Sequence, residues 1–277
     1  MTRSYTLGTL AVLAGLLPIG CRKTGTPDEP ARKTALANYH QIVKAQYEYH
    51  NRYDSFAGGI AAGKGVGLSW RVAVLPYLGE DALYREFKLD EPWDSPANRP
   101  LVERMPAVFA SPGNPAPHGH TFVRSTQGPG GMTPFTPATR LPDHATAGTL
   151  LRGRSLGWKT NNVTDGTANT VMFVEAGEPV PWSKPDELPV PFSNADFADV
   201  PVQVPPLGGV FADGFHVAMV DGVVRFLNRG YPEKGLAVML TPSGGEVWQE
   251  RDHPKEFVAY STSPPSPLPA VWEKPIR

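Results

Sequence analysis

Alternating apolar and polar positions mark the region around residue 220 as a β-hairpin. Two alternating runs, 215–220 and 223–227, flank the dipeptide Asp221-Gly222. An Asp-Gly pair between such runs is typical of a two-residue type I′ loop. A loop of these two residues places a wholly apolar set on one face, which another element must cover, and leaves His216 on a mixed face. The apolar set is Phe215, Val217, Met219, Val224 and Phe226.

A period of three to four residues replaces this alternation in the N-terminal third of the chain. Apolar and aromatic side chains recur on one side of a helix predicted over residues 31–53, about six turns long. A stripe this wide predicts a helix that lies flat against a sheet, and we interpret its aromatic residues as packing residues rather than as a ligand surface. The stripe consists of Leu36, Tyr39, Val43, Tyr47, His50 and Tyr53, widened by Ile42 and Tyr49.

Shorter elements are predicted between this helix and the hairpin. Ser69 can cap a helix over residues 70–77, which Pro76 kinks or ends. A second short helix is predicted over residues 81–87. Residues 105–109 are predicted to form a short strand.

A buried strand is predicted over residues 171–176, because an apolar run precedes the glutamate of this segment. The strand follows a second tight turn, Asp165-Gly166. Residues 178–206 are punctuated by prolines and are expected to cross the surface, and a short helix is predicted over 233–240. The fold class is therefore α+β, an N-terminal helix packed on a small antiparallel sheet with long Pro/Gly-rich insertions.

Composition agrees with a sheet that carries long irregular segments. The 277 residues include 31 prolines and 28 glycines, and residues 111–150 are the least regular stretch. The net charge is -1 with acidic and basic residues interspersed, which gives no electrostatic footprint for nucleic acid.

The N-terminus resembles a bacterial lipoprotein signal. Arg3 precedes an apolar run at residues 7–19, which ends at Gly20-Cys21, although Pro18 stands where the signal usually has leucine. A run of about 13 residues fits a secretory signal better than a membrane span of about 20. In such signals the cysteine is lipidated and becomes the new N-terminus; an uncleaved membrane anchor is the alternative.

Lipidation of Cys21 would leave no free thiol, because the chain has a single cysteine. Disulfides, cysteine nucleophiles and thiolate metal sites are then excluded. The predicted organisation is a signal peptide at residues 1–21, a tether at 22–30, one α+β domain at 31–260, and a proline-rich, disordered tail at 261–277.

Two groups of residues are candidate metal ligands. Asp90, Glu91 and Asp94 surround a tryptophan between two prolines and can offer calcium several hard oxygens. The other interpretation of this segment is a solvated turn in which Asp94 or Ser95 caps a helix. His118 and His120 share one face of an extended segment and can bind a transition metal. The ligands that would complete this shell are Asp143 and His144.

Three tryptophans are candidate stacking platforms for a sugar or another solute, namely Trp93, Trp158 and Trp182. The sequence contains no G-x-S-x-G elbow, H-E-x-x-H pair, Walker motif or Rossmann fingerprint. We therefore expect a protein that is not an enzyme, and a hydrolase that uses Asp, Glu and His side chains is the least favoured alternative.

A series of segments over residues 38–247 follows the motif order of a known family. The segments are N-Y-H-Q at 38–41, L-S-W-R-V-A-V-L-P-Y-L at 68–78, L-Y-x-x-F-x-L-D-E-P-W-D-S-P-x-N at 83–98, G-P-G at 128–130, T-D-G-T-A-N-T-V-M-F-V-E-A at 164–176, V-P-W-S-K-P at 180–185, and the hairpin. They resemble a bacterial family of unknown function, sometimes labelled solute-binding, with a prepilin-type N-terminus and a C-terminal His-x9-Asp-Gly motif. The resemblance implies a pseudopilin-like body.

The chain departs from this family at three places. The prepilin start, Phe-Thr-Leu followed by an acidic residue, is only echoed by Y-T-L-G at residues 5–8, which puts filament assembly in doubt. Phe211 stands ten residues before Asp221, where the family motif has histidine, so no role of that histidine carries over. Ala110 stands where relatives often have cysteine.

The favoured function is a non-enzymatic protein of the bacterial cell envelope, exported and held at a membrane by its lipid anchor. Its long loops would form an interaction surface for a protein or glycan partner. The alternative is a lipoprotein that binds a solute or glycan. No cofactor is expected apart from a structural calcium ion at the acidic segment around residue 91.

Overall fold

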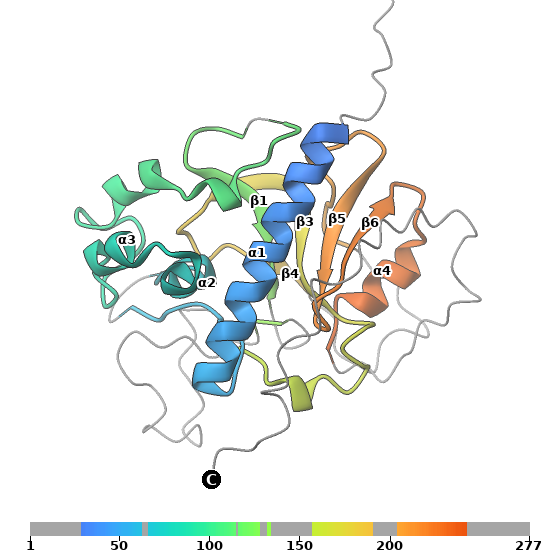
Figure 1. The fold of residues 1–277 in the computed structure, drawn as a ribbon, viewed down its shortest axis with the longest axis horizontal. Coiled ribbons are helices and arrows are strands. Elements are labelled where there is room, and N and C mark those ends of the chain that lie inside the picture. Colours follow the sequence, from blue (N-terminus) through green and yellow to red (C-terminus); the bar gives the residue numbers. More distant parts are fainter. Residues whose placement is uncertain are drawn as a thin grey trace, which may run out of the picture.

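A long helix packed across an antiparallel sheet forms the centre of the molecule (Figure 1). The computed structural model describes residues 29–62, 66–114, 116–127, 132–133, 157–190 and 204–242. Their four-stranded sheet has the order β1-β3-β5-β6 with antiparallel neighbours. The predicted α+β class is confirmed. The helix is α1 (Glu29–Tyr53), and the strands are β1 (His120–Arg124), β3 (Val171–Pro181), β5 (Gly214–Met219) and β6 (Val224–Asn228).

Helix α1 covers the hairpin as predicted, and it begins two residues before the predicted start. It runs alongside β5, because Arg32 near its N-terminal end pairs with Asp213, and the Tyr47 hydroxyl, three quarters of the way along, donates to the Val220 carbonyl. Between these points the ring of Tyr39 lies 5.3 Å from that of Phe173 in β3. The aromatic stripe of the sequence is therefore the face that packs on the sheet.

The hairpin loop contains one residue more than predicted. Ala218 pairs with Val224, whereas a two-residue loop would pair it with Arg225. The Gly222 N–H donates to the Met219 carbonyl at 3.0 Å, and Gly222 has a φ of 91°. This is the geometry of a type I turn followed by a left-handed glycine that forms a bulge, which is the usual three-residue solution.

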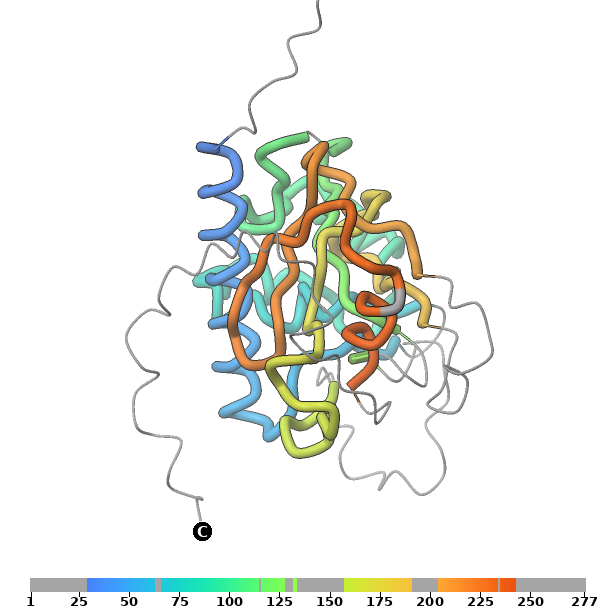
Figure 2. The backbone as a smooth tube through the Cα atoms, turned by 90° about the vertical axis from the view of Figure 1, so that its right-hand side faces the viewer, coloured from blue at the N-terminus to red at the C-terminus, as the bar shows by residue number. Residues whose placement is uncertain are grey.

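The extra loop residue reverses the faces that β6 presents, because side chains alternate along a strand. Phe226 and Val224 lie on the same face as His216, beneath α1, and the predicted apolar set is therefore wrong. Both faces of β5 are buried. The second face packs against α4 (Glu233–Met239), which lies on the side of the sheet opposite to α1 (Figure 2).

The short helices between α1 and β1 follow most of the predictions. The Ser69 hydroxyl accepts from the Arg71 N–H at 3.3 Å and caps α2 (Trp70–Ala73). Pro76 lies in the 3-10 helix that follows α2, and α3 is found where the second short helix was predicted. Residues 105–109 are not a strand but contain a 3-10 turn. These elements are η1 (Leu75–Leu78), α3 (Asp81–Glu86), η2 (Arg99–Arg104) and η3 (Ala107–Phe109).

Two parts of the sheet lie in segments that were predicted to be irregular. Strand β1 falls within residues 111–150, and β3 continues five residues beyond its predicted end at Ala176. The prediction that residues 178–206 cross the surface is wrong for Trp182 and Leu188, which are buried. The remaining elements are β2 (Thr126–Gln127), which pairs in parallel with β4 (Leu188–Pro189), and η4 (Thr160–Asn162).

Several predictions concern residues outside the described part of the chain. They include the signal peptide with Cys21, most of the tether and the proline-rich tail. Among the described helices, none is both long and apolar enough to cross a bilayer.

Candidate functional site

The acidic segment proposed for calcium is organised by a buried amide. Asn98 is fully buried; its side-chain N–H groups donate to the carbonyls of Lys88 and Pro92, each at 2.9 Å. Asp90 and Asp94 are exposed, and the Ser95 hydroxyl accepts from the Asn98 N–H at 3.1 Å, directly before η2. The described residues contain no group of three His, Cys, Asp or Glu side chains placed to hold a metal. The geometry therefore does not support the predicted calcium site at Asp90, Glu91 and Asp94.

The histidines proposed for a transition metal make other contacts. His118 Nδ1 contacts the Glu103 carboxylate, and His120 Nδ1 lies 2.9 Å from the His118 carbonyl. Asp143 and His144 lie outside the described residues. In the part of the chain that the structure describes, the two histidines are thus partnered by a carboxylate and a backbone oxygen.

The proposed tryptophan platforms do not form one surface. Trp182 is completely buried, and its indole N–H donates to the Val102 carbonyl at 3.1 Å, so the prediction that it stacks on a ligand is wrong. Burial against Phe109 and Phe87 in the core accounts for the error. Trp93 and Trp158 are half-buried against the same core.

Both Asp-Gly pairs occupy turns, as predicted. Gly166 has a φ of 93°, close to that of Gly222. The Asn169 N–H donates to the Gly166 carbonyl at 3.0 Å, and the Asn169 side chain donates to the Asp165 carbonyl at 2.9 Å. Glycine is required at these positions because a side chain strains a backbone with positive φ.

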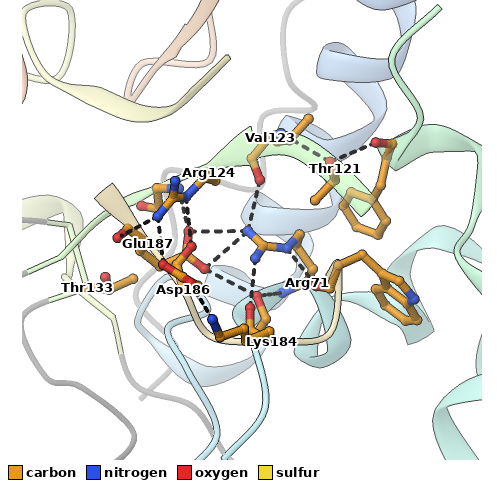
Figure 3. A network of polar contacts seen from close by, with 12 residues as sticks. Arg71, Thr121, Val123, Arg124, Thr133, Lys184, Asp186 and Glu187 are labelled. Atoms are coloured by element: carbon orange, nitrogen blue, oxygen red, sulfur yellow. Dashed lines mark hydrogen bonds and ion pairs between the residues drawn. The ribbon is translucent and has the colours of Figure 1, made fainter. Parts of the chain in front are cut away.

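A buried ion pair fastens α2 to the segment between β3 and β4 (Figure 3). Arg71 and Glu187 have side chains exposed by 0% and 4%, and their closest atoms are 3.1 Å apart. The Arg71 guanidinium also donates to the carbonyls of Trp182, Val123 and Lys184 at 2.7, 2.8 and 3.0 Å. Each of its nitrogens is therefore occupied by the protein itself, which marks the network as a structural one.

A groove lies beside this network. Arg124 at its edge pairs with Asp186 at 2.8 Å, and Asp186 also receives a bond from Lys184 at 2.6 Å. The groove has a volume of about 310 Å³. It is lined by Arg124, Glu178, Leu188, Pro189, Val204, Pro205 and Pro206.

The second buried polar cluster lies beneath α1 and consists of Tyr39, Glu175 and His216. Glu175 accepts from the Val210 N–H at 2.9 Å with Oε1, while its Oε2 lies 3.6 Å from His216 Nδ1. The His216 ring is enclosed by aromatic rings, including that of Tyr39 at 5.5 Å. The side chains of Glu175 and His216 are exposed by only 3% and 4%.

Two polar atoms of this cluster have no hydrogen-bond partner among the described residues. They are the Tyr39 hydroxyl and His216 Nδ1, both buried. Burial raises the pKa of the Tyr39 hydroxyl well above its usual range, and the Glu175 carboxylate adds to the rise. Buried polar groups normally find a partner, so these orphan atoms make the cluster the candidate functional site.

Two small cavities meet this cluster from different sides. A cavity of about 10 Å³ is bordered by Tyr39 and Glu175, together with Asn38 and Ser111 at the surface. A second cavity of about 80 Å³ reaches His216 and is otherwise largely apolar. Its lining residues are Glu29, Arg32, Lys33, Leu36, His216, Val224 and Phe226.

Comparison with known families gives one match. Residues 29–201, more than half of the chain, match the profile of a family described as "Protein of unknown function (DUF1559)". The chain belongs to this family. No match is found among curated proteins, and none among solved structures.

The DUF1559 match begins at the first residue of α1 and includes Tyr39 and Glu175 of the candidate site. It ends before the hairpin, so it leaves His216 and the Phe211 position outside. The match therefore does not bear on the His-x9-Asp-Gly resemblance or on the prepilin-like start of the chain.

The sequence contains signals for the buried clusters, although these signals form no motif. Glu175 directly follows the apolar run V-M-F-V, and Arg71 is the charged residue within L-S-W-R-V-A-V-L. A charged residue within such a run is either exposed or paired inside the core. What the sequence could not give is the partner of each charge, because those partners are distant in the chain.

Proposed function

We propose that the protein is a non-enzymatic lipoprotein of the bacterial cell envelope, held at a membrane by Cys21. The observation that carries the proposal is the spacing between Cys21 and Glu29, the first residue of α1. Eight residue steps reach at most about 30 Å. The lipid would therefore keep the N-terminal end of α1 close to the membrane surface.

In this arrangement α1 acts as the spacer of the molecule. Its 25 residues correspond to a length of about 37 Å. The Arg32 end lies near the membrane, and the Tyr53 end and the hairpin turn lie up to one helix length further away. Partner binding is then expected at the end of the body remote from the anchor.

The test is the chemistry of the mature N-terminus. We expect mass spectrometry of protein purified from a bacterial membrane fraction to find a diacylglyceryl group on Cys21. Cys21→Ala should abolish the modification, whereas Thr24→Ala, in the same segment, should leave it intact. A wild-type protein with an intact or unlipidated leader would contradict the proposal and favour the uncleaved anchor.

A lipoprotein that binds a solute or glycan is the second candidate, and the groove beside Arg124 favours it. Its volume of about 310 Å³ is at the lower end of the range of ligand sites. We expect a thermal-shift screen of glycans and small solutes to find a ligand whose effect is lost in Arg124→Met. If no compound of the panel raises the melting temperature, the solute-binding alternative is ruled out and the first proposal stands alone.

A further inference from the structure

The groove of about 310 Å³ lies between two walls that backbone hydrogen bonds hold in place. One wall is β4, whose Leu188 N–H donates to the Ser125 carbonyl at 2.9 Å. The other wall is the segment 204–206, in which the Pro206 carbonyl accepts from the Gly177 N–H of β3 at 2.7 Å. Prolines in both walls restrict the backbone further, because their rings fix φ. The groove is therefore preformed, and little ordering is needed when a ligand enters it.

A bulge in β3 carries a carboxylate to this groove. The register of the sheet shifts between Thr121 and Val123 of β1, where one residue of β1 faces four residues of β3, 176–179. Glu178 is one of these four, lines the groove, is exposed, and makes no hydrogen bond or ion pair with a described residue. Bulges commonly re-aim a side chain beside a functional site. The bulge therefore presents Glu178 to a ligand rather than to the rest of the fold.

Arg124 offers the opposite charge in the same groove. Its side chain is only 10% exposed, and three bonds hold its guanidinium. Nε donates to the Asp186 carbonyl at 2.8 Å, and Nη2 donates to the Asp186 carboxylate at 2.8 Å and to the Glu187 carbonyl at 3.1 Å (Figure 3). Nη1 donates to none of the described residues, which leaves its two N–H groups for a ligand. A guanidinium fixed in this way is preorganised to bind an anionic group.

The charges around the groove leave one positive charge in excess on this side. Arg71 is paired with Glu187. Arg124 and Lys184, by contrast, share the single carboxylate of Asp186. A ligand carboxylate bound at Arg124 balances this excess, and the partly enclosed position strengthens the attraction relative to open water.

The remaining lining of the groove is apolar and restricts the size of a ligand. Leu188 belongs to the apolar cluster that includes α4, and Val204 packs against this cluster. Three prolines complete the lining. A volume of about 310 Å³ holds roughly ten non-hydrogen atoms, at the roughly 30 Å³ that a water molecule occupies in the liquid. This is close to the size of a small dipeptide, whose two termini carry the charges that Arg124 and Glu178 complement.

We propose that the groove binds a dipeptide with apolar side chains. The carboxylate of the dipeptide binds Arg124 Nη1, its ammonium group binds the Glu178 carboxylate, and its side chains lie against Leu188 and the prolines. The assignment rests on the second candidate function, since it names the class of solute. It does not depend on the lipid anchor.

Isothermal titration calorimetry of the purified full-length protein tests the proposal with L-alanyl-L-leucine as the probe. We expect this dipeptide to bind, and its N-acetyl and C-terminal amide derivatives to bind roughly tenfold more weakly, because each lacks one terminal charge. Glu178→Gln should weaken binding of the dipeptide by a similar factor but leave binding of the N-acetyl derivative unchanged. Glu48→Gln is the matched control, because its carboxylate is 42% exposed on α1, on the side of the sheet opposite to α4.

Arg124→Met should remove the preference for the dipeptide over its amide. If this variant does not fold, Glu178→Gln carries the test alone, because Glu178 is exposed and bonds to no described residue. No binding of the dipeptide, or equal affinities of the wild type and Glu178→Gln, would overturn the dipeptide assignment. If a glycan or neutral solute binds when the dipeptide does not, the second candidate function survives without this ligand class. If no solute binds at all, both are overturned.

Discussion

The guanidinium carbon of Arg32 lies 4.1 Å from the centre of the Phe226 ring. The same side chain lies above Phe211 at 5.5 Å and pairs with Asp213. The contact joins the first turns of α1 to β6 and to the segment before β5. The Arg32 side chain is only 10% exposed, so water screens its attraction to the ring little. The contact should therefore make a measurable contribution to stability.

Arg32→Met should lower the free energy of unfolding by roughly 1–2 kcal/mol, because it keeps an apolar stem but removes the cation from the Phe226 ring and from Asp213. Urea denaturation followed by tryptophan fluorescence measures this change. Lys33→Met is the control, since its side chain is 73% exposed and should change stability little. Equal effects of the two substitutions would show that neither the ring contact nor the Asp213 pair contributes to stability.

Glu187→Gln should be much more damaging, because it leaves the Arg71 charge buried and uncompensated. We expect a loss of about 3–5 kcal/mol in urea denaturation. Glu48→Gln, whose carboxylate is 42% exposed, should stay within about 1 kcal/mol of the wild type. The double substitution Arg71→Met/Glu187→Leu should cost less than Glu187→Gln alone; a larger cost would contradict the charge explanation.

Gly222→Ala should lower the free energy of unfolding by roughly 1–2 kcal/mol, because the turn requires a positive φ. An added Cβ would also approach Tyr47 Cε2 to 3.3 Å. Gly230→Ala serves as the control, since an added Cβ there meets its nearest atom at 3.6 Å. Differential scanning calorimetry can rank the two variants, and a stable Gly222→Ala would contradict the bulged three-residue loop.

Stability should fall as the pH drops through the range of histidine titration. Burial lowers the pKa of His50 below 6.5, Asp54 opposes this shift, and Lys159 adds to it. His50 Nε2 accepts from the Thr160 N–H at 3.5 Å and lies 3.0 Å from the Thr160 hydroxyl, contacts that suit a neutral ring. The unfolded chain therefore binds more protons than the folded one, and the stability present above pH 6.5 is lost below it.

His50→Gln should reduce the loss of stability between pH 7.5 and pH 5.5, measured as the shift of the urea midpoint. His40, whose pKa burial also lowers, should retain part of the pH dependence. A variant whose midpoint falls as steeply as that of the wild type would rule out His50 as a contributor.

Periodicity predicted the elements whose side chains repeat regularly. The stripe that ends at Tyr53 located α1, and the apolar run before Glu175 located β3. It missed β1, because four of the five residues of this strand are buried and no alternation marks it. The hairpin register was wrong by one residue because Asp-Gly fits a two-residue loop and a bulged three-residue loop equally well.

The candidate site could not be predicted from local sequence. Glu175, Tyr39 and His216 come from β3, α1 and β5, and only the packing of α1 on the sheet brings them together. The residue types in local sequence segments instead predicted metal sites at Asp90 and His118. In the structure Asp90 is exposed, and His118 contacts Glu103. Residues that gather from distant segments have no spacing pattern for a motif to record.

The bonds that fix α1 on β5 also determine when this chain can fold. Tyr47 and Val220 are 173 positions apart, and Arg32 and Asp213 are 181 positions apart. Contacts at such separations form late and slowly, because a long loop must close before they contribute. A growing chain cannot complete its core until the hairpin has been synthesised. The proposed passage across a membrane fits this topology, because the core cannot close before the hairpin, about four fifths of the way along the sequence, has been made.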